Sequence, residues 1–372
     1  MKAVAVFPQS RELRVIDDHP EPKISAPTEV KLRMLEVGVC GTDKEICHFD
    51  YGTPPNGSDY LVLGHESLGE VVEIGPGVTS LKPGDLVVVM VRRPCEEPGC
   101  VACRAGRQDF CYTGKFKERG INQLHGFMAE FVVDDEKYMF RVPPELRGIG
   151  VLTEPLTIAE KALREVNNVQ LRLPWACPVE PGKPREFCHN AVVLGAGPVG
   201  LLGAMALATS GFKTFVYSRD EKPNAGSDFV EKIGGTYISS STHNIEQLAE
   251  EVGNIDLVYE ATGASKFAFD TLRVLGTNGV YIFTGVPGRK GPIELDTDTI
   301  MRNLVLKNQV VFGSVNAGRD AYTGAIEDLA KFEQHWPGAA ASLITGRYPI
   351  TDASKLACQG VGGIKNVVAI NQ

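Results

Sequence analysis

The sequence predicts a two-part α/β protein, with a β-rich domain first and a doubly wound parallel sheet after it. Short apolar runs broken by Gly and Pro fill residues 1–142, whereas strand and helix patterns alternate from residue 190 onward. The length of 372 residues also favours two domains, because a domain averages about 150 residues.

Turn residues separate the apolar runs of the first half, as in Gly75-Pro76-Gly77 and Lys82-Pro83-Gly84-Asp85. The pattern predicts an antiparallel, barrel-like domain with strands at residues 2–7, 30–37, 67–74, 86–91 and 127–133. Apolar spacing becomes helical between Leu152 and Val166. The Pro-rich stretch 174–184 is interpreted as a connection between domains.

The second half predicts six strands with crossover helices, including a helix that begins at Pro198. The strands are expected at residues 191–194, 214–217, 236–238, 256–259, 280–283 and 310–312. A helix at 321–332 and a last strand at 364–370, which returns to the first domain, complete the prediction. The expected domains are therefore 1–188 with 317–372, and 189–316.

Composition excludes several classes of function. The chain is 43% hydrophobic and 23% charged, and no apolar run approaches the roughly 20 residues that span a bilayer. A net charge of −8 disfavours binding to nucleic acid, whose phosphates it would repel. Residues 1–7 lack the pattern of a secretory signal, so a cytoplasmic protein is expected. Nine cysteines, four of them between residues 95 and 111, are better explained by metal ligation than by disulfides.

The segments Cys40-Gly41-Thr42-Asp43 and Gly64-His65-Glu66 supply a thiolate, an imidazole and a carboxylate. A catalytic zinc ion takes three protein ligands and keeps one position open, so this set predicts an enzyme. Glu154 is the best candidate for a further donor, in case Glu66 does not reach the metal. The alternative for each residue alone is an ordinary packed or solvated side chain, and only the set favours a metal.

Four cysteines have the spacing C-x4-C-x2-C-x7-C in a loop rich in Pro and Gly, which predicts a closed structural zinc site. They are Cys95, Cys100, Cys103 and Cys111. One alternative is a lobe of ordinary thiols that holds together without metal. Another is a zinc-ribbon binding module for nucleic acid or protein, which the acidic charge argues against. The remaining candidates lack such support and are interpreted as mostly structural: Cys47, His48, Cys177, Cys188 and Cys358.

A Gly-x-Gly-x-x-Gly motif follows the first strand of the second half and opens a helix, which is typical of a dinucleotide site. It consists of Gly195, Ala196, Gly197, Pro198, Val199 and Gly200. The next strand ends in Tyr217-Ser218-Arg219-Asp220, where Arg219 suits a 2′-phosphate and favours NADP over NAD. Asp220 and Glu221 keep NAD open as a second coenzyme, and the alternative for Arg219 is a solvated loop residue.

Gly64-His65-Glu66-Ser67-Leu68-Gly69 with Gly75 and Val78 resembles the zinc signature of medium-chain alcohol dehydrogenases, and residues 195–200 resemble their coenzyme motif. Within that superfamily, three further segments resemble zinc-dependent glucose dehydrogenases of archaeal type: Arg92-Arg93-Pro94, 106–111 and Glu118-Arg119-Gly120-Ile121. The resemblance covers nearly the whole chain. It implies a GroES-like catalytic domain and a Rossmann coenzyme domain.

The resemblance also implies an activity, namely oxidation of C1 of an aldopyranose to the lactone by NADP in a homotetramer or dimer. Cys40 and His65 would bind the catalytic zinc, Glu66 and Glu154 would ligate it directly or through water, and Thr42 would begin a proton relay. The implied sugar contacts are Thr42, Glu118, Glu154 and Asn316. The implied coenzyme contacts beyond the glycine motif are Ser218, Arg219, Thr284, Gly285, Val286, Val315, Asn316 and Lys365.

Two departures from the family pattern concern the zinc lobe and the sugar. The x4 spacing between Cys95 and Cys100 is longer than the usual x2, and Val91 stands where some relatives have Asn. A polyol or secondary-alcohol dehydrogenase of the sorbitol type remains the alternative activity, because the same zinc ligands resemble those enzymes.

Overall fold

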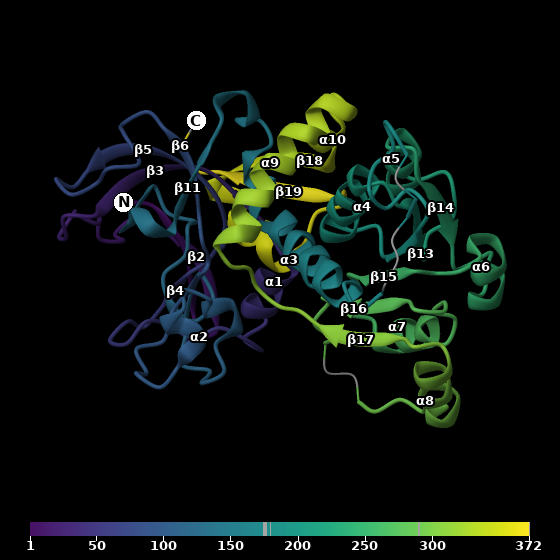
Figure 1. Ribbon diagram of the computed structural model, residues 1–372. Helices are drawn as coiled ribbons and strands as arrows, with labels where there is room; N and C mark the ends of the chain where they lie inside the picture. The colour runs from purple at the N-terminus through teal and green to yellow at the C-terminus, as the bar shows by residue number, and fades with distance from the viewer. Residues whose placement is uncertain (174–176, 179, 289–290, 372) are drawn as a thin grey trace. The chain divides into compact units, whose positions relative to one another are not determined.

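A computed structural model describes residues 1–173, 177–178, 180–288 and 291–371 (Figure 1). The chain divides into two compact units. The first comprises residues 1–157, 316–329 and 343–372, and the second comprises residues 158–315 and 330–342. This division falls within helix α3 (Thr153–Gln170) rather than at residue 188. The described part of the Pro-rich stretch 174–184 belongs to the second unit, and its residues 174–176 and 179 lie outside the described residues.

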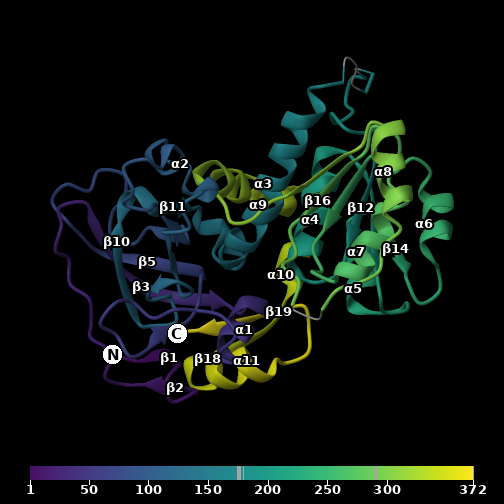
Figure 2. The same ribbon diagram turned by 90° about the horizontal axis from the view of Figure 1, so that it is seen from below.

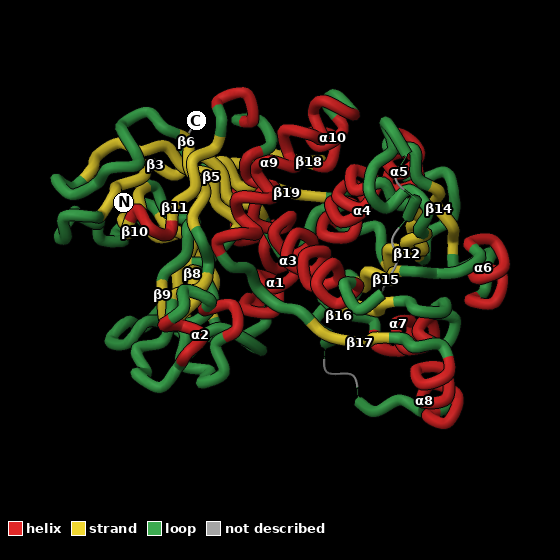
Figure 3. The backbone as a smooth tube through the Cα atoms, viewed as in Figure 1, coloured by secondary structure: helices red, strands yellow, loops and turns green. Residues whose placement is uncertain are grey.

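The first unit is built from strands and loops, which Figure 3 shows in yellow and green. Its main sheet has the strand order β11-β6-β5-β3-β19-β18, and β10 also pairs with β3. These strands are β3 (Glu29–Gly38), β5 (Glu66–Ile74), β6 (Leu86–Val89), β10 (Phe131–Asp135), β11 (Met139–Val142), β18 (Ile344–Pro349) and β19 (Lys365–Ala369). The predicted last strand does return to this domain, because β19 pairs antiparallel with β3.

Two small sheets complete the first unit, in the orders β2-β1-β4 and β7-β8-β9. Their strands are β1 (Ala3–Phe7), β2 (Glu12–Ile16), β4 (Leu61–Val62), β7 (Arg92–Arg93), β8 (Lys117–Arg119) and β9 (Gln123–Leu124). The helices of this unit are α1 (Gly41–Cys47), α2 (Val101–Arg104), the start of α9 (Arg319–His335) and α11 (Ala353–Gln359). Alternating side chains of β1, β3, β5 and β6 form its buried core, which also contains Ile46, Phe127 and Met128.

The second unit is a doubly wound parallel sheet with the strand order β14-β13-β12-β15-β16-β17. The strands are β12 (Asn190–Leu194), β13 (Lys213–Ser218), β14 (Thr236–Ser239), β15 (Leu257–Glu260), β16 (Val280–Phe283) and β17 (Val310–Gly313). The helices are α4 (Pro198–Ser210), α5 (Ala225–Lys232), α6 (Ile245–Val252), α7 (Ser265–Leu272), α8 (Thr297–Leu306) and α10 (Ala339–Leu343). The strand order reverses direction at β12, so right-handed crossovers place α4 and α5 on one face and α6 to α8 on the other (Figure 2).

The sequence predicted these six strands within one or two residues, because each is an apolar run bounded by turn residues. Among the helices that the structure describes, none combines the length and apolar character needed to cross a bilayer.

The strand predicted at residues 127–133 is displaced, and β10 begins at Phe131. Phe127 and Met128 are fully buried, but their amides bond to the carbonyls of Gly64 and Leu63 at 2.9 Å instead of forming a regular ladder. This segment therefore lies against the Gly64-His65-Glu66 motif. Apolar composition alone did not distinguish it from a strand.

Gly64 is the residue of the motif that cannot carry a side chain. Its φ is +90°, and a Cβ would approach Met128 Cγ and Val37 Cγ1 to 2.7 Å. Gly84 has a φ of +91° with no atom within 4 Å of the same position. Substitutions at Gly64 and Gly84 therefore separate the cost of backbone strain, which both would carry, from the cost of steric overlap, which only Gly64 would carry.

We expect Gly84→Ala to destabilise the protein by about 1 kcal/mol, the cost of a left-handed backbone alone. Gly64→Ala should cost a further 1–3 kcal/mol or so, because the core must move to admit the methyl group. Urea unfolding midpoints of both variants, measured with zinc in excess, test this. Equal losses in the two variants would contradict the steric argument.

Candidate active site

Strand pairing brings the predicted metal ligands together. Gly38 of β3 lies opposite Glu66 of β5, Cys40 follows two residues beyond Gly38, and His65 immediately precedes β5. The ligand atoms of Cys40, His65 and Glu66 lie within 4.8 Å of one another. Two strands adjacent in the sheet thus bring Cys40 together with His65 and Glu66, which follow it by 25 and 26 residues in the sequence.

The donor set fits a zinc ion. His65 and Glu66 are only 4% and 1% exposed, so both donors are held away from bulk water. A buried imidazole, a thiol and a carboxylate are the donors that zinc takes in a catalytic site.

Asp43 is a functional residue that sequence reasoning named but did not assign. Its Oδ2 accepts a hydrogen bond from the Cys40 amide at 2.9 Å, and its Oδ1 lies 3.5 Å from His65 Nδ1. Burial lowers the pKa of His65, but the carboxylate of Asp43 outweighs burial and raises it. Asp43 therefore orients both ligands, as carboxylates behind metal-bound histidines do. Its position three residues after Cys40, in the first turn of α1, is the signal that could have found it.

Lys365 lies beside the candidate zinc donors. Its Nζ forms an ion pair with Glu66 and donates to the carbonyl of Val39 at 2.9 Å, and the residue is 2% exposed. Burial lowers the pKa of Lys365, but the neighbouring anionic groups, the carboxylate of Glu66 above all, together have the larger effect, and the pKa is raised. The ammonium compensates the buried carboxylate, while its implied contact with the coenzyme stays a prediction.

Glu154 and Thr42 are less directly connected to the donor set. Glu154 stands in the first turn of α3, where burial, reinforced by Glu66 and opposed by His65, raises its pKa to about 7. Among the described residues, it does not belong to the set whose ligand atoms all lie within 4.8 Å. Thr42 is half-buried in α1, two residues after Cys40. The ligand role of Glu154 and the relay role of Thr42 stay predictions.

The four cysteines of the lobe also converge. Cys95 and Cys103 lie 3.6 Å apart at sulfur, as do Cys100 and Cys111 at 3.9 Å, and all four sulfurs are within 4.8 Å. Ligands about 2.3 Å from a tetrahedral zinc ion are about 3.8 Å from one another, so the spacing fits. Burial raises the pKa of Cys111, but bonds from Thr113 outweigh it and lower it to about 6. The longer x4 spacing therefore does not prevent closure of the cluster.

Glu118 forms a buried anchor with two further side chains. Glu118 Oε1 accepts from Arg92 Nε and from Asn316 Nδ2, both at 3.0 Å. Arg92 and Glu118 face each other across the β7–β8 pair, and the guanidinium stacks 3.7 Å from the centroid of Phe116. Asn316 is thereby placed beside the predicted sugar anchor, whereas its implied coenzyme contact stays a prediction. Sequence reasoning did not assign a role to Arg92.

The glycine motif in the second unit has the geometry of a dinucleotide turn. Gly195 follows β12 with φ +100°, Gly197 is the N-cap residue of α4, and a Cβ on Gly200 would overlap the carbonyl of Gly195. A Cβ at Gly197 would meet no atom within 4 Å. The turn thus leaves space at Gly197, directly before the helix N-terminus that Pro198 and Val199 begin.

Arg219 is presented at the end of β13. Its carbonyl accepts from Ser239 Oγ at 3.0 Å, and the Ser218 carbonyl accepts from the Ser240 amide at 2.8 Å, so the backbone is fixed. The Arg219 side chain is 90% exposed and lies 3.5 Å from Asp220 Oδ1. The guanidinium is therefore accessible to a phosphate.

Glu260 organises the loops that follow β15 and β16. This buried carboxylate accepts bonds from the amides of Thr262 and Gly263 at 2.6 and 2.9 Å, and from the Gly285 amide at 3.2 Å. Thr284 Oγ1 also donates to the Glu260 carbonyl, at 2.6 Å. The predicted nicotinamide-side residues Thr284 and Gly285 are thus held in place, and Glu260 is a third residue, after Asp43 and Arg92, that sequence reasoning missed.

Two valines predicted to contact the coenzyme are exposed. Val286 is 70% and Val315 54% exposed, and the Val315 carbonyl accepts from Lys161 Nζ at 3.0 Å. Exposed apolar side chains at this edge are compatible with a ligand that covers them, and their role stays a prediction.

Comparison with known proteins identifies the family. Residues 147–370 match the family model "Glucose dehydrogenase C-terminus", and residues 26–144 match "Alcohol dehydrogenase GroES-like domain". The chain belongs to the glucose 1-dehydrogenase family. Its GroES-like part corresponds to the β-rich first unit and its parallel sheet to a Rossmann domain.

Relatives within this family align with almost the whole chain. Glucose 1-dehydrogenase of Methanocella arvoryzae is 38% identical over 100% of this chain and 98% of its own. That of Thermoproteus tenax is 40% identical over 94% of each. The structure of Haloferax mediterranei glucose dehydrogenase in complex with NADP, Zn and gluconolactone matches with a TM-score of 0.86 at 32% identity, covering 100% of both chains.

The expectation that the cysteines bind metals rather than form disulfides is wrong for one pair. Cys177 and Cys188 form a disulfide. An 11-residue separation carries no signal for pairing in a chain without an evident cysteine framework, so the sequence could not reveal it. Cys47 and Cys358 belong to the hydrophobic core, which agrees with their structural interpretation.

We expect Asp43→Asn to weaken zinc binding at the Cys40–His65–Glu66 site by about 10- to 100-fold, because the ligands lose their orienting carboxylate. Competition with a chromophoric chelator measures this, and the four-cysteine site should retain its metal. Asp85→Asn is the matched control, since Asp85 also accepts from the amide three residues earlier, Lys82, at 3.0 Å. Equal zinc affinity in both variants would contradict the role of Asp43.

Proposed function

We propose that this chain is a zinc-dependent glucose 1-dehydrogenase that oxidises C1 of D-glucose to the lactone and transfers hydride to NADP. The convergence of Cys40, His65 and Glu66 in a buried set carries the proposal. It is supported by full-length similarity to glucose 1-dehydrogenases, one of which was crystallised with NADP, zinc and gluconolactone.

The residues of the first unit would bind zinc and move the proton. Cys40, His65 and Glu66 would hold zinc, with Glu154 as a further ligand or a contact to the sugar. Zinc, when bound, supplies a Lewis acid that lowers the pKa of the C1 hydroxyl. Thr42 then passes the released proton toward solvent, and Asp43 keeps the two ligands in place.

Glu118 would fix the orientation of the sugar. Its carboxylate is held by Arg92 and Asn316, which keeps it an acceptor for sugar hydroxyls. A fixed acceptor orients C1 for hydride transfer at little entropic cost. Asn316 offers its own amide to the same sugar face.

NADP would bind along the carboxyl edge of the parallel sheet. The pyrophosphate is expected at residues 195–200, and the 2′-phosphate at Ser218 and the exposed Arg219. Thr284, Gly285 and Val286 would then lie along the nicotinamide, with Val315 and Lys365 as further contacts. Asp220 leaves NAD as a second coenzyme.

We further propose that the four-cysteine lobe holds a second, structural zinc, and that the protein acts in the cytoplasm, where NADP is supplied. Saturation of the cluster closes every coordination position, so this metal would stabilise the loop without entering the reaction. Two zinc ions per chain by elemental analysis is the expected result.

A substrate panel tests the activity. Rates on glucose, galactose, xylose and sorbitol are compared with NADP and NAD, and the lactone is identified by chromatography. We expect the highest kcat/KM for glucose with NADP, loss of activity after zinc removal by a chelator, and recovery on zinc addition. Oxidation of sorbitol without oxidation of glucose would instead establish the polyol dehydrogenase alternative.

We expect Arg219→Ala to raise the KM for NADP by about 10- to 100-fold and to change the KM for NAD little, because a phosphate contact is worth about 1.5–3 kcal/mol. Lys232→Ala, an exposed cation in the last turn of α5, is the control and should leave both values unchanged. Parallel loss with both coenzymes would show that Arg219 does not recognise the 2′-phosphate.

A homo-oligomer is also proposed. Strand β17 is an edge strand of its sheet, and α8, which precedes it, exposes Met301, Val305 and Leu306 by 64–70%. Unpaired edge groups beside exposed apolar side chains favour pairing with a second copy. Val305→Glu should therefore convert a dimer or tetramer to smaller species in sedimentation velocity, and an unchanged distribution would exclude this surface.

A further inference from the structure

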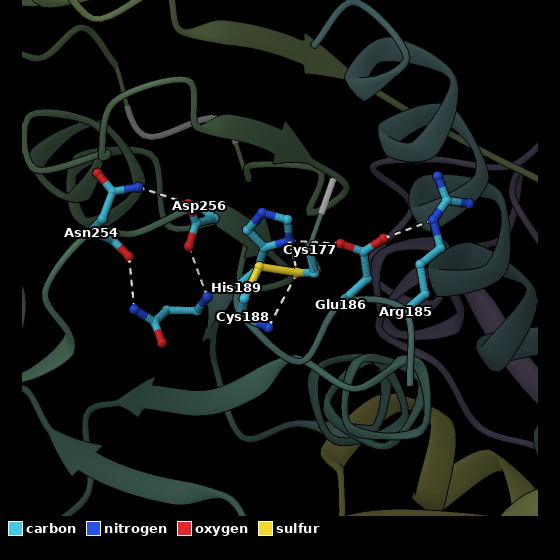
Figure 4. Close-up of a disulfide and its surroundings, with 8 residues drawn as sticks. Cys177, Arg185, Glu186, Cys188, His189, Asn254 and Asp256 are labelled. Carbon is cyan, nitrogen blue, oxygen red and sulfur yellow. Dashed lines mark hydrogen bonds and ion pairs between the residues drawn. A yellow bond between two sulfur atoms is a disulfide. The ribbon is translucent and has the colours of Figure 1, made fainter. Parts of the chain in front are cut away.

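The disulfide between Cys177 and Cys188 lies in the second unit, in the segment between α3 and β12 (Figure 4). Its two sulfurs stand in different surroundings. Cys177 is 8% exposed, whereas Cys188 is an exposed residue. The proposed glucose oxidation uses neither of them, so their chemistry is a separate question.

A backbone donor and an imidazole lie at the buried sulfur. The backbone amide of Cys188 donates to Cys177 Sγ at 3.2 Å, and Nδ1 of His189 lies 3.6 Å from the same atom. Figure 4 shows the imidazole directly beside the disulfide. Cys177 is thus the sulfur on which a negative charge would be stabilised.

Charged neighbours determine the state of His189. Its Nδ1 lies 2.7 Å from Glu186 Oε2, and Glu186 Oε1 pairs with Arg185 Nε at 3.2 Å. The bond to Glu186 raises the pKa of His189, burial opposes this and Asp256 adds to it. Phe212 packs against the ring at 6.1 Å between centroids. Near neutral pH, the imidazole therefore gains cationic character next to the Cys177 sulfur.

We propose that Cys177–Cys188 is a thiol-exchange site, at which a small-molecule thiol attacks the exposed sulfur of Cys188 and the buried Cys177 departs as a thiolate. The rate of such an exchange depends on access to the attacked sulfur and on the stability of the leaving thiolate. The two sulfurs of this disulfide supply these two properties separately. The site is independent of the proposed dehydrogenase activity.

The exchange is balanced in two steps. The attacking thiolate forms a new S–S bond with Cys188 as the Cys177–Cys188 bond breaks, and the electron pair remains on Cys177. A second small thiolate then attacks the sulfur of the first, releasing the small disulfide and leaving both cysteines reduced. Two electrons pass from two small thiols to the protein, and an oxidised small disulfide reverses the sequence.

Location of the products tests the proposal. Folded protein is incubated with reduced glutathione at neutral pH, quenched with acid, alkylated and mapped by peptide mass spectrometry. We expect glutathione on Cys188 and the alkyl group on Cys177. Glutathione on Cys177 would overturn the proposal. So would a slow exchange rate, namely one no higher than the rate at which a reference thiol exchanges with the same concentration of oxidised glutathione.

Two variants test direction and the role of His189. Cys177→Ser, treated with oxidised glutathione, should accumulate one adduct on Cys188. In Cys188→Ser the remaining thiol is the buried Cys177, which should react at least about tenfold more slowly. His189→Asn should slow exchange by about tenfold at pH 7, because the leaving thiolate loses the imidazole that lies beside Cys177 Sγ. His243→Asn, an exposed histidine of the same unit, is the matched control. Equal reactivity of the two single-cysteine variants, or an unchanged rate in His189→Asn, would refute the asymmetry on which the proposal rests.

Discussion

The antiparallel pairing of β3 with β5 is the constraint on which the candidate active site depends. It sets Gly38 opposite Glu66, and from that register Cys40 and His65 emerge at the same edge of the sheet. A slip of one residue would turn Glu66 to the other face and separate the three donors. The left-handed backbone at Gly64 and the burial of Phe127 and Met128 against it hold the motif in this position. The positions of the three donors thus follow from strand register, and the loops have little freedom to alter these positions.

Three buried carboxylates in the first unit are each matched by a cation. Glu66 pairs with Lys365, Glu118 with Arg92, and Asp134 with Arg93 and Arg119. Burial of such pairs is costly and adds little net stability, but loss of one partner leaves an unpaired charge in a dry interior. The arrangement therefore fixes the orientations of the carboxylates that are predicted to contact the metal and the sugar. Specificity of geometry, rather than a gain in folding free energy, is what these pairs supply.

Local sequence predicted those features that depend on neighbouring residues in the chain. The six strands and the strand–turn–helix around the glycine motif are local patterns, and the structure confirms both. It also brings the four cysteines of the local spacing together, while their metal stays a prediction. Asp43, Arg92 and Glu260 were missed because their importance lies in which atoms they reach across the fold. The Cys177–Cys188 pairing was missed for the same reason. The strand predicted at residues 127–133 shows the opposite error. Its apolar residues predicted a strand, but the start of this segment is buried against the Gly64-His65-Glu66 motif without joining a strand ladder.

The position of β19 in the chain bears on how the protein is made. This strand pairs with β3 and carries Lys365, yet it is synthesised after the entire parallel-sheet unit, whose own strands are all contiguous in sequence. Until it emerges, the central strand of the first unit has an open edge and Glu66 has no cation. The nascent first unit is therefore an unfinished sheet, whereas the second unit can fold during translation. Completion of the candidate zinc site would then be a late step in biosynthesis, because Lys365 reaches Glu66 only after the second unit has been synthesised.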